Sequence, residues 1–368
     1  MSAFDSIQIE AFRGLPKTAL DGCGRVNLIV GPNNCGKTSV LEAMALLCCP
    51  DDLEWWIDAL WPREVKGART PEREVIEMAF PHWSGAGEAE LFAGMLRVGA
   101  SLRENGHSDR RSIEAQIREK KIAPRDLDYF QLLRSDGSRP EPPEGVHTTV
   151  VAQLAVSLTR GENTIQALWH QLNELGALPY PTPEKKNQIP CSYVTTVSHR
   201  TESLADLVSE AVLNDRKSQL MGILTALQPS ITDFHTRTRE GQRPQVWLRD
   251  SKAGWLPISV AGDGLRRAFH FAVAAVGATG GVLLIDEIES ALHTSALSAV
   301  FGFLVRECAE LDVQIFATTH SLESLDAIMA QSVSEDSLVT YSMTAEGVRR
   351  ISLKDLRIVR EEHGFDIR

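Results

Sequence analysis

The apolar residues of this chain concentrate in short runs that predict buried strands. Three of these runs cover residues 26–30, 281–285 and 313–318. A longer apolar stretch covers 268–285, but His270, Thr279 and the Gly280-Gly281 pair interrupt it. We therefore expect a buried helix, a turn and a strand in this stretch, and no membrane span.

Weaker patterns predict the remaining elements. Strands are expected over 4–12, 90–104, 191–196, 245–249 and 348–353, helices over 202–214 and 216–227, and loops over the Pro/Gly-rich segments 135–147 and 176–190. The charged segment 108–121 carries the basic residues Arg110, Arg111, Arg118, Lys120 and Lys121, interleaved with Glu114 and Glu119. A solvated helix face is the favoured interpretation, because the acids cancel much of the charge. The alternative is a contact surface for nucleic acid or for a partner protein.

The run at 26–30 leads directly into a phosphate-binding motif. The next residues are Gly31-Pro32-Asn33-Asn34-Cys35-Gly36-Lys37-Thr38-Ser39, followed by a helical pattern. They fit G-x-x-x-x-G-K-[ST] at every fixed position, in the strand–loop–helix context that this motif needs. The glycines let backbone N–H groups point at phosphate oxygens, and the helix N-terminus adds to that field. We expect this loop to bind a nucleoside triphosphate, with Lys37 on the β- and γ-phosphates and the Thr38 hydroxyl on Mg²⁺.

The composition limits the class of protein. A chain of 368 residues that is 43% hydrophobic and 24% charged is ordinary for a globular protein of two or three domains, or of one large domain with an insertion. Its net charge of −11 does not favour non-specific DNA binding, although a local basic groove is compatible with it. None of the six cysteines forms a C-x-x-C pair, so neither a zinc site nor a disulfide framework is predicted. The N-terminus lacks the pattern of an export signal, and we expect a cytoplasmic protein with reduced thiols.

Two acids after the run at 281–285 complete the candidate active site. Asp286 and Glu287 stand at the end of this strand. We expect Asp286 to hold Mg²⁺, directly or through water, and Glu287 to polarise the water that attacks the γ-phosphate. The alternative is that the two acids only cap the next helix. A phosphate-binding loop in the same chain favours the catalytic interpretation.

Three further segments carry a resemblance to a known family. Residues 259–267 read Ser-Val-Ala-Gly-Asp-Gly-Leu-Arg-Arg, 290–293 read Ser-Ala-Leu-His, and 316–321 read Phe-Ala-Thr-Thr-His-Ser. Together with the long insertion between Lys37 and Asp286, this order resembles the OLD/RecF-like ABC-type ATPases. It is most similar to the stand-alone OLD-like ATP-binding proteins of bacteria. The resemblance covers 1–50 and 190–368.

The resemblance implies that two copies of the chain share each nucleotide. Gly262, Asp263 and Gly264 are similar to the ABC signature, whose N–H groups meet the phosphate held by the opposite subunit. The spacing from Ser259 to Gly262 departs by one residue from the common form, which leaves open the residue that contacts the phosphate. Residues 290–293 are similar to a D-loop, which lies at a dimer interface, or they simply begin a helix.

Two more roles follow from the resemblance. His320 is similar to the switch histidine that reads the γ-phosphate. Arg13, within a Phe-Arg-Gly segment, either approaches the nucleotide phosphates or forms a surface salt bridge. A Q-loop glutamine is implied within the insertion, but the sequence assigns none.

The fold that the resemblance implies is α/β, a P-loop NTPase of the ABC/SMC-head type with a mixed sheet. A parallel core sheet, an antiparallel subsheet near the N-terminus and a largely helical insertion are expected. Residues 1–50 and 191–368 would form the two parts of the ATPase head, and 51–190 the insertion or lid.

The resemblance also implies partners. ATP with Mg²⁺ would join a homodimer or a higher homo-oligomer, and hydrolysis would release it. The first hypothesis is an ATPase sensor or scaffold of a bacterial anti-phage defence system that controls a separate nuclease or toxin, because the chain carries too few late acids for the Toprim domain of OLD nucleases. The alternative is a RecF-type repair clamp that binds DNA. A transport ATPase is disfavoured, and no membrane partner is expected.

Overall fold

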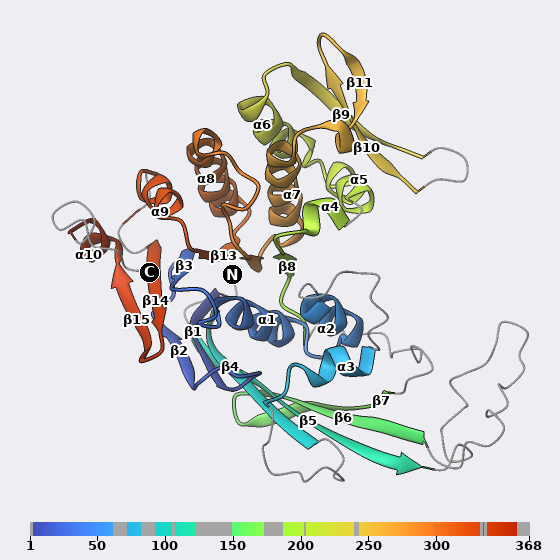
Figure 1. The fold of residues 1–368 in the computed structure, drawn as a ribbon, viewed down its shortest axis with the longest axis vertical. Coiled ribbons are helices and arrows are strands. Elements are labelled where there is room, and N and C mark those ends of the chain that lie inside the picture. Colours follow the sequence, from blue (N-terminus) through green and yellow to red (C-terminus); the bar gives the residue numbers. More distant parts are fainter. Residues whose placement is uncertain are drawn as a thin grey trace, which may run out of the picture.

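The structure is a computed structural model that describes residues 3–61, 72–81, 93–104, 107–122, 149–172, 187–201, 204–238, 243–331, 334 and 337–358. Two six-stranded sheets and one three-stranded sheet alternate with layers of helices (Figure 1). The predicted loop 135–147 and most of the predicted loop 176–190 lie outside the described residues.

The core sheet is parallel except at one edge. Its strand order is β15-β14-β3-β13-β12-β8, and only β14 and β15 pair antiparallel. Its strands are β3 (Val26–Val30), β8 (Cys191–Val194), β12 (Val282–Ile285), β13 (Gln314–Thr319), β14 (Leu338–Thr344) and β15 (Gly347–Ser352). Every residue of β3, β12 and β13 is buried, which explains why these strands appear as unbroken apolar runs. The three predicted buried strands are confirmed.

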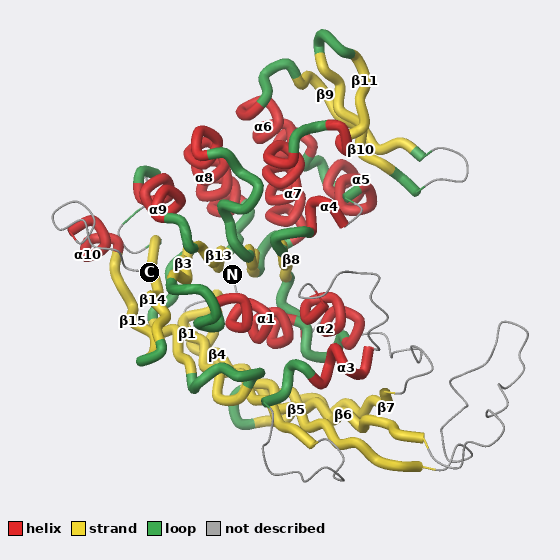
Figure 2. The backbone as a smooth tube through the Cα atoms, viewed as in Figure 1, coloured by secondary structure: helices red, strands yellow, loops and turns green. Residues whose placement is uncertain are grey.

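Helices cover both faces of the core sheet (Figure 2). One layer contains α1 (Lys37–Cys48), α2 (Leu53–Leu60) and α3 (Glu72–Glu77). The opposite layer contains α4 (Ser198–Thr201), α5 (Ala205–Leu213), α6 (Lys217–Leu227), α7 (Asp263–Gly277), α8 (Thr294–Glu310) and α9 (Leu322–Met329), and α10 (Leu353–Arg357) packs at the β14–β15 edge. Two hydrophobic clusters fill these layers, one on each side of the core sheet. The predicted helix–turn–strand unit over 268–285 is confirmed as the end of α7 and β12.

The second six-stranded sheet corrects the expectation for the insertion. Its order is β2-β1-β4-β5-β6-β7, and all its pairings are antiparallel. Its strands are β1 (Ala3–Ala11), β2 (Thr18–Asp21), β4 (Ala93–Glu104), β5 (His107–Ile122), β6 (Thr149–Arg160) and β7 (Asn163–Leu172). The predicted antiparallel subsheet near the N-terminus is confirmed. The expectation of a largely helical insertion is wrong for the described part of 51–190, where four long strands outweigh α2 and α3.

The charged segment 108–121 shows why that expectation failed. It forms most of β5, in which Ile113, Ala115 and Ile117 are buried and the residues between them are half-exposed. That alternation has the period of a strand and not of a helix. Arg111 is not part of a solvated helix face, because its guanidinium donates hydrogen bonds to the carbonyl oxygens of Cys48 and Asn187. Burial lowers the pKa of Arg111.

A small sheet lies at the far end of the molecule, beyond α5 and α6 (Figure 1). Its antiparallel strands are β9 (Ile231–Arg237), β10 (Gln245–Asp250) and β11 (Gly254–Pro257), in the order β11-β10-β9. One face packs on the helices through Ile231, Phe234, Val246 and Leu248. A 3₁₀ turn at Ile258–Val260 then connects β11 to α7. Among the described residues, no helix is both long enough and apolar enough to cross a membrane.

Candidate functional site

The carboxyl ends of β3, β12 and β13 meet at one edge of the core sheet and form a cleft. This is the edge at which open α/β sheets bind their ligands. The cleft has a volume of about 990 Å³. Its lining brings together the predicted phosphate-loop residues Asn33, Asn34, Cys35, Gly36, Lys37, Thr38 and Ser39 with Arg13, Asp286 and Glu287.

The backbone of the phosphate loop requires its two fixed glycines. Gly36 has φ 97°, and a Cβ at this position would lie 2.2 Å from Cδ2 of Leu15. A Cβ at Gly31 would lie 2.4 Å from the carbonyl oxygen of Met343. Both distances are far below van der Waals contact, so only glycine allows the loop to curl at the N-terminus of α1.

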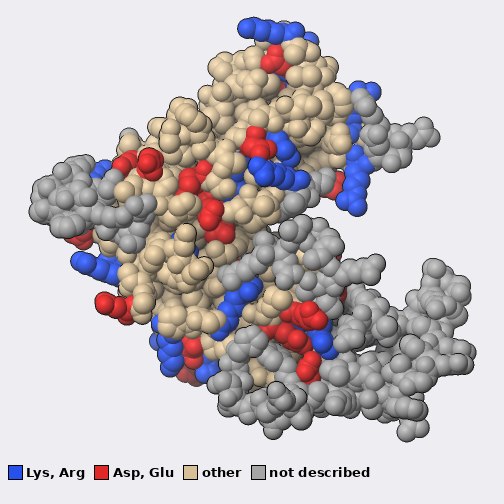
Figure 3. Space-filling model, in the orientation of Figure 1, with Lys and Arg blue, Asp and Glu red and all other residues tan. Residues whose placement is uncertain are grey.

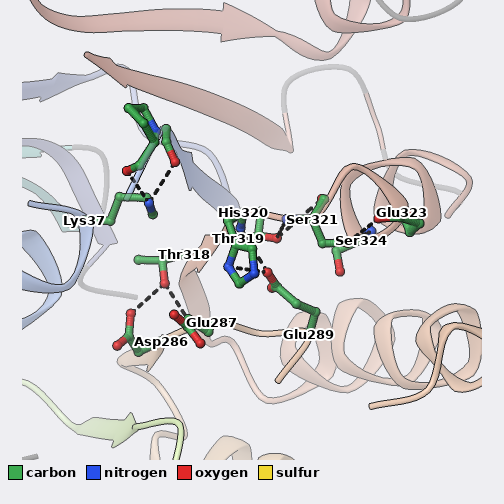
Figure 4. Close-up of polar contacts among 12 residues, drawn as sticks. Lys37, Asp286, Glu287, Glu289, Thr318, Thr319, His320, Ser321, Glu323 and Ser324 are labelled. Carbon is green, nitrogen blue, oxygen red and sulfur yellow. Dashed lines mark hydrogen bonds and ion pairs between the residues drawn. The ribbon is translucent and has the colours of Figure 1, made fainter. Parts of the chain in front are cut away.

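Lys37 lies over the loop that it is expected to serve. Its Nζ donates hydrogen bonds to the carbonyl oxygens of Gly31 and Pro32, both at 2.8 Å (Figure 4). These acceptors are neutral, and an ammonium group binds an anionic oxygen more strongly. A phosphate entering the loop can therefore replace them.

The two predicted metal residues are neighbours in space. Thr38 Oγ1 lies 3.1 and 3.2 Å from the two carboxylate oxygens of Asp286. Thr318, at the end of β13, donates a hydrogen bond of 2.6 Å to the same carboxylate. Hydroxyl and carboxylate oxygens fit Mg²⁺, which proteins hold through one or two such ligands and the phosphates of a nucleotide. The described residues contain no group of three or more His, Cys, Asp or Glu that could hold a metal ion.

Glu287 has a strained backbone that is held from two sides. Its φ is 45°, which is unusual for a residue with a side chain. Its N–H donates to Thr318 Oγ1 at 2.8 Å, and its carbonyl oxygen accepts from Arg267 at 2.9 Å. Burial, and then the charge of Asp286, raises the pKa of the Glu287 carboxyl, with His320 and Lys37 opposing. A higher pKa makes the carboxylate a better proton acceptor.

Arg267 is a positioning residue that the sequence did not assign. It is fully buried, and its guanidinium donates to the carbonyl oxygens of Thr195 at 2.7 Å, Asp286 at 2.8 Å and Glu287 at 2.9 Å. Burial lowers its pKa to about 10, so it stays charged at neutral pH. One signal was present in the sequence: Arg267 stands directly before the apolar stretch 268–285, within the signature-like segment.

The imidazole of His320 lies beside the carboxylate of Glu289 (Figure 4). Its Nδ1 lies 3.1 Å from a carboxylate oxygen of Glu289, and its backbone N–H donates to the same oxygen at 2.9 Å. The imidazole side chain is 50% exposed and is not among the groups that line the cleft. Its orientation is therefore fixed by Glu289 within one chain, and its expected role as a switch stays a prediction.

The signature-like residues lie outside the cleft. Gly262 precedes the first residue of α7, and nothing lies within 4 Å of a Cβ placed on it. Asp263 forms ion pairs with Arg200 and Arg266, and the hydrogen bond from Arg200 lowers its pKa. A Cβ at Gly264 would lie 3.2 Å from the carbonyl oxygen of Ala291, so the signature-like and D-loop-like segments pack together.

Arg13 fits neither expectation alone, because it lines the cleft and also forms a salt bridge. It lines the cleft, and its Nε lies 2.9 Å from a carboxylate oxygen of Glu42, which is fully buried on α1. The salt bridge is thus buried rather than superficial. The Q-loop glutamine that the resemblance implies within 51–190 stays unassigned.

Comparison with known proteins identifies the family of the chain. A family model described as "AAA domain, putative AbiEii toxin, Type IV TA system" matches residues 100–326. An ATP/GTP phosphatase from Helicobacter pylori is 22% identical over 360 residues, which cover 88% of this chain and 86% of that protein. The uncharacterized protein MJECL11 from Methanocaldococcus jannaschii is 32% identical over 113 residues, or 29% of this chain and 98% of that protein.

Comparison with solved structures finds heads of SMC proteins. The SMC head domain from Thermotoga maritima is 12% identical, has a TM-score of 0.43, and covers 95% of this chain and 98% of its own. A Pyrococcus furiosus Smc head domain, bound to the C-terminal domain of ScpA, is also 12% identical, has a TM-score of 0.47, and covers 99% of this chain and all of its own.

Proposed function

Because the chain belongs to the family "AAA domain, putative AbiEii toxin, Type IV TA system", it is a P-loop ATPase of the AAA type, and we propose that it hydrolyses ATP between two copies of itself. The supporting observation is that the phosphate loop and the signature-like segment of one chain lie in different places. The cleft holds the phosphate loop, Asp286 and Glu287, whereas Gly262 and Gly264 lie outside it. In a symmetric dimer, the exposed start of α7 from one copy would face the nucleotide of the other copy.

The residues of the cleft have separate tasks in this proposal. Lys37 and the loop N–H groups bind the β- and γ-phosphates, and Thr38 with Asp286 would hold Mg²⁺. The ion would neutralise charge on the phosphate oxygens. Glu287 orients the attacking water and accepts its proton, and its raised pKa supports that task. His320 would meet the γ-phosphate after leaving Glu289.

Arg267 connects the signature-like segment with the two acids of the same chain. It stands on the first turns of α7, five residues after Gly262, and contacts the backbone of both acids. A movement of the signature-like segment on closing would therefore be passed directly to Asp286 and Glu287. This coupling favours a switch in which ATP closes the dimer and hydrolysis opens it.

We further propose that this switch controls a separate effector protein, such as a nuclease or a toxin of an anti-phage defence system. The resemblance to stand-alone OLD-like ATPases supports this step. The test is purification of tagged Glu287→Gln protein from its own host with ATP, because this variant should hold ATP without hydrolysing it. Recovery of a specific partner protein, absent from a Lys37→Ala control, is the expected result. Recovery of duplex DNA and no partner protein would overturn the effector proposal in favour of a RecF-type clamp.

A further inference from the structure

The sheet formed by β9, β10 and β11 presents an outer face that no part of the ATPase site uses. Its register places Asp233, His235 and Arg237 of β9 beside Gln245, Trp247 and Arg249 of β10, with Trp255 on β11. The inner face packs on the helices, so these side chains point the other way. His235, Arg237, Arg249 and Trp255 are all exposed, and Trp247 is half-exposed.

Cations and aromatic rings alternate on this face. The guanidinium of Arg237 lies 5.5 Å from the centre of the Trp247 ring, and that of Arg249 lies 5.9 Å from the centre of the Trp255 ring. The His235 ring contacts the Trp255 ring edge-on at 4.2 Å. The tryptophans are therefore fixed by neighbours on the sheet and still present ring surface to solvent, with Trp255 38% exposed.

The charge of this face is opposite to that of the whole chain. The described part of 231–257 contains four cations, Arg237, Arg243, Arg249 and Lys252, and two carboxylates, Asp233 and Asp250. Asp233 pairs with Lys217 of α6, and Asp250 accepts hydrogen bonds from the turn that follows it. Among the described residues, neither Arg237 nor Arg249 has a carboxylate within salt-bridge distance. Figure 3 shows Lys and Arg atoms at the tip and along one side of the part of the molecule that contains β9–β11.

We propose that this face, defined by His235, Arg237, Trp247, Arg249 and Trp255, binds single-stranded nucleic acid. Aromatic side chains on which bases stack, combined with cations that follow the phosphates, are the features by which proteins bind single strands without reading sequence. Bases in a duplex are already stacked on one another and cannot use such rings. The net charge of −11 is no obstacle, because the cations are local and their acids are engaged elsewhere.

The test is fluorescence anisotropy of a labelled oligothymidine of about 20 nucleotides, a length that covers a complete single-strand site. The full chain should bind it more tightly than a duplex of equal length, and binding should weaken between about 50 and 200 mM salt. Trp255→Ala should weaken binding about tenfold, whereas Trp255→Phe, which keeps a ring, should retain most of it. Arg237→Ala with Arg249→Ala should lower the salt slope by about 0.7 for each phosphate that the protein no longer neutralises.

Three controls make the outcome decisive. Arg103→Ala removes an exposed arginine from β4, in the six-stranded antiparallel sheet, and should leave binding unchanged. Lys37→Ala should also bind the oligonucleotide normally, so the result does not depend on the proposed ATPase mechanism. Melting temperatures should match that of the original chain, because the substituted side chains are on the solvent side of the sheet. Absence of binding at low salt, equal binding by Trp255→Ala, or a protein partner that needs Trp255 while the oligonucleotide does not bind, would each overturn the proposal.

Discussion

The two six-stranded sheets of this molecule bury their residues in different ways. The core sheet has helices on both faces, and its central strands β3, β12 and β13 are buried throughout. The antiparallel sheet buries alternate residues of β5 against α1–α3 and leaves the intervening ones half-exposed. Almost every group of the candidate site follows a strand of the core sheet. Helices cover both faces of the core sheet, so the loops after its strands meet at one edge. The catalytic groups lie at this edge.

Among the predictions that test this difference between the two sheets, the largest effect is expected for substitution of Glu287. Glu287→Gln should lower the rate of ATP hydrolysis by about 10²–10⁴-fold, because the base is lost, and should leave ATP binding intact. Glu310→Gln, at an exposed carboxylate on α8, is the matched control. Steady-state phosphate release and equilibrium nucleotide binding measure the two properties separately.

The pH profile gives a second check on the same residue. A general base works when it is deprotonated, and burial raises the pKa of Glu287 above the usual 4.5. Hydrolysis should therefore fall as the pH decreases through that raised value, at a higher pH than for an ordinary glutamate. An unchanged rate in Glu287→Gln would exclude Glu287 as the base.

Lys37 should be next in the size of its effect. Lys37→Ala removes the ammonium from the phosphate loop, and ATP affinity should fall about 100-fold, because charge-assisted bonds to phosphate are lost. Lys17→Ala, at an exposed lysine near the cleft, should keep its affinity. Nucleotide titration measures both variants, and retained ATP affinity in Lys37→Ala would contradict the assignment of the loop.

Arg267 tests the framework that positions the acids. Arg267→Ala leaves three buried carbonyl groups without their donor, and the free energy of unfolding should fall by about 3 kcal/mol. Arg266→Ala loses a partly exposed ion pair and should cost less than about 1 kcal/mol. Urea unfolding gives the stabilities. Equal losses in the two variants would show that Arg267 does not hold the acids.

The smallest effect is expected for a substitution in β5 of the six-stranded antiparallel sheet. Ala115 lies in the buried row of β5 together with Ile113 and Ile117, so Ala115→Gln should destabilise the chain by about 2 kcal/mol through overpacking and a buried amide. In a helix, position 115 would face away from 113 and 117 and would accept glutamine. Gln116→Ala, in the other row, should change the stability by less than about 0.5 kcal/mol. A neutral Ala115→Gln would return the segment to the helical interpretation.

The core sheet could be predicted well because its central strands have a clear local sequence pattern. Apolar runs end in Gly31, Asp286 and Thr318, and the loop motif has a fixed spacing, so strand, edge and chemistry could be inferred together. In β5, the row of Ile113, Ala115 and Ile117 was hidden by charged neighbours, and a small residue at its centre weakened the period-two signal. No role could be assigned to Arg267 from the sequence, because its partners are backbone carbonyl groups, which every residue has. The outer face of β9–β11 could not be predicted either, since its residues come together only through strand pairing.

The central claim is that one chain supplies the phosphate loop and a second chain supplies the signature-like segment. Mixed dimers of two inactive variants test it most directly. Gly262→Asp should fold normally, because space is open around that position, and it should block the nucleotide of the opposite copy. Lys37→Ala inactivates the loop of its own copy. Co-expressed together, the two should regain about a quarter of the ATPase rate, since half of the dimers form by mixing and each holds one intact site. A mixture that stays inactive, or a Gly262→Asp chain that is fully active alone, would contradict a shared site.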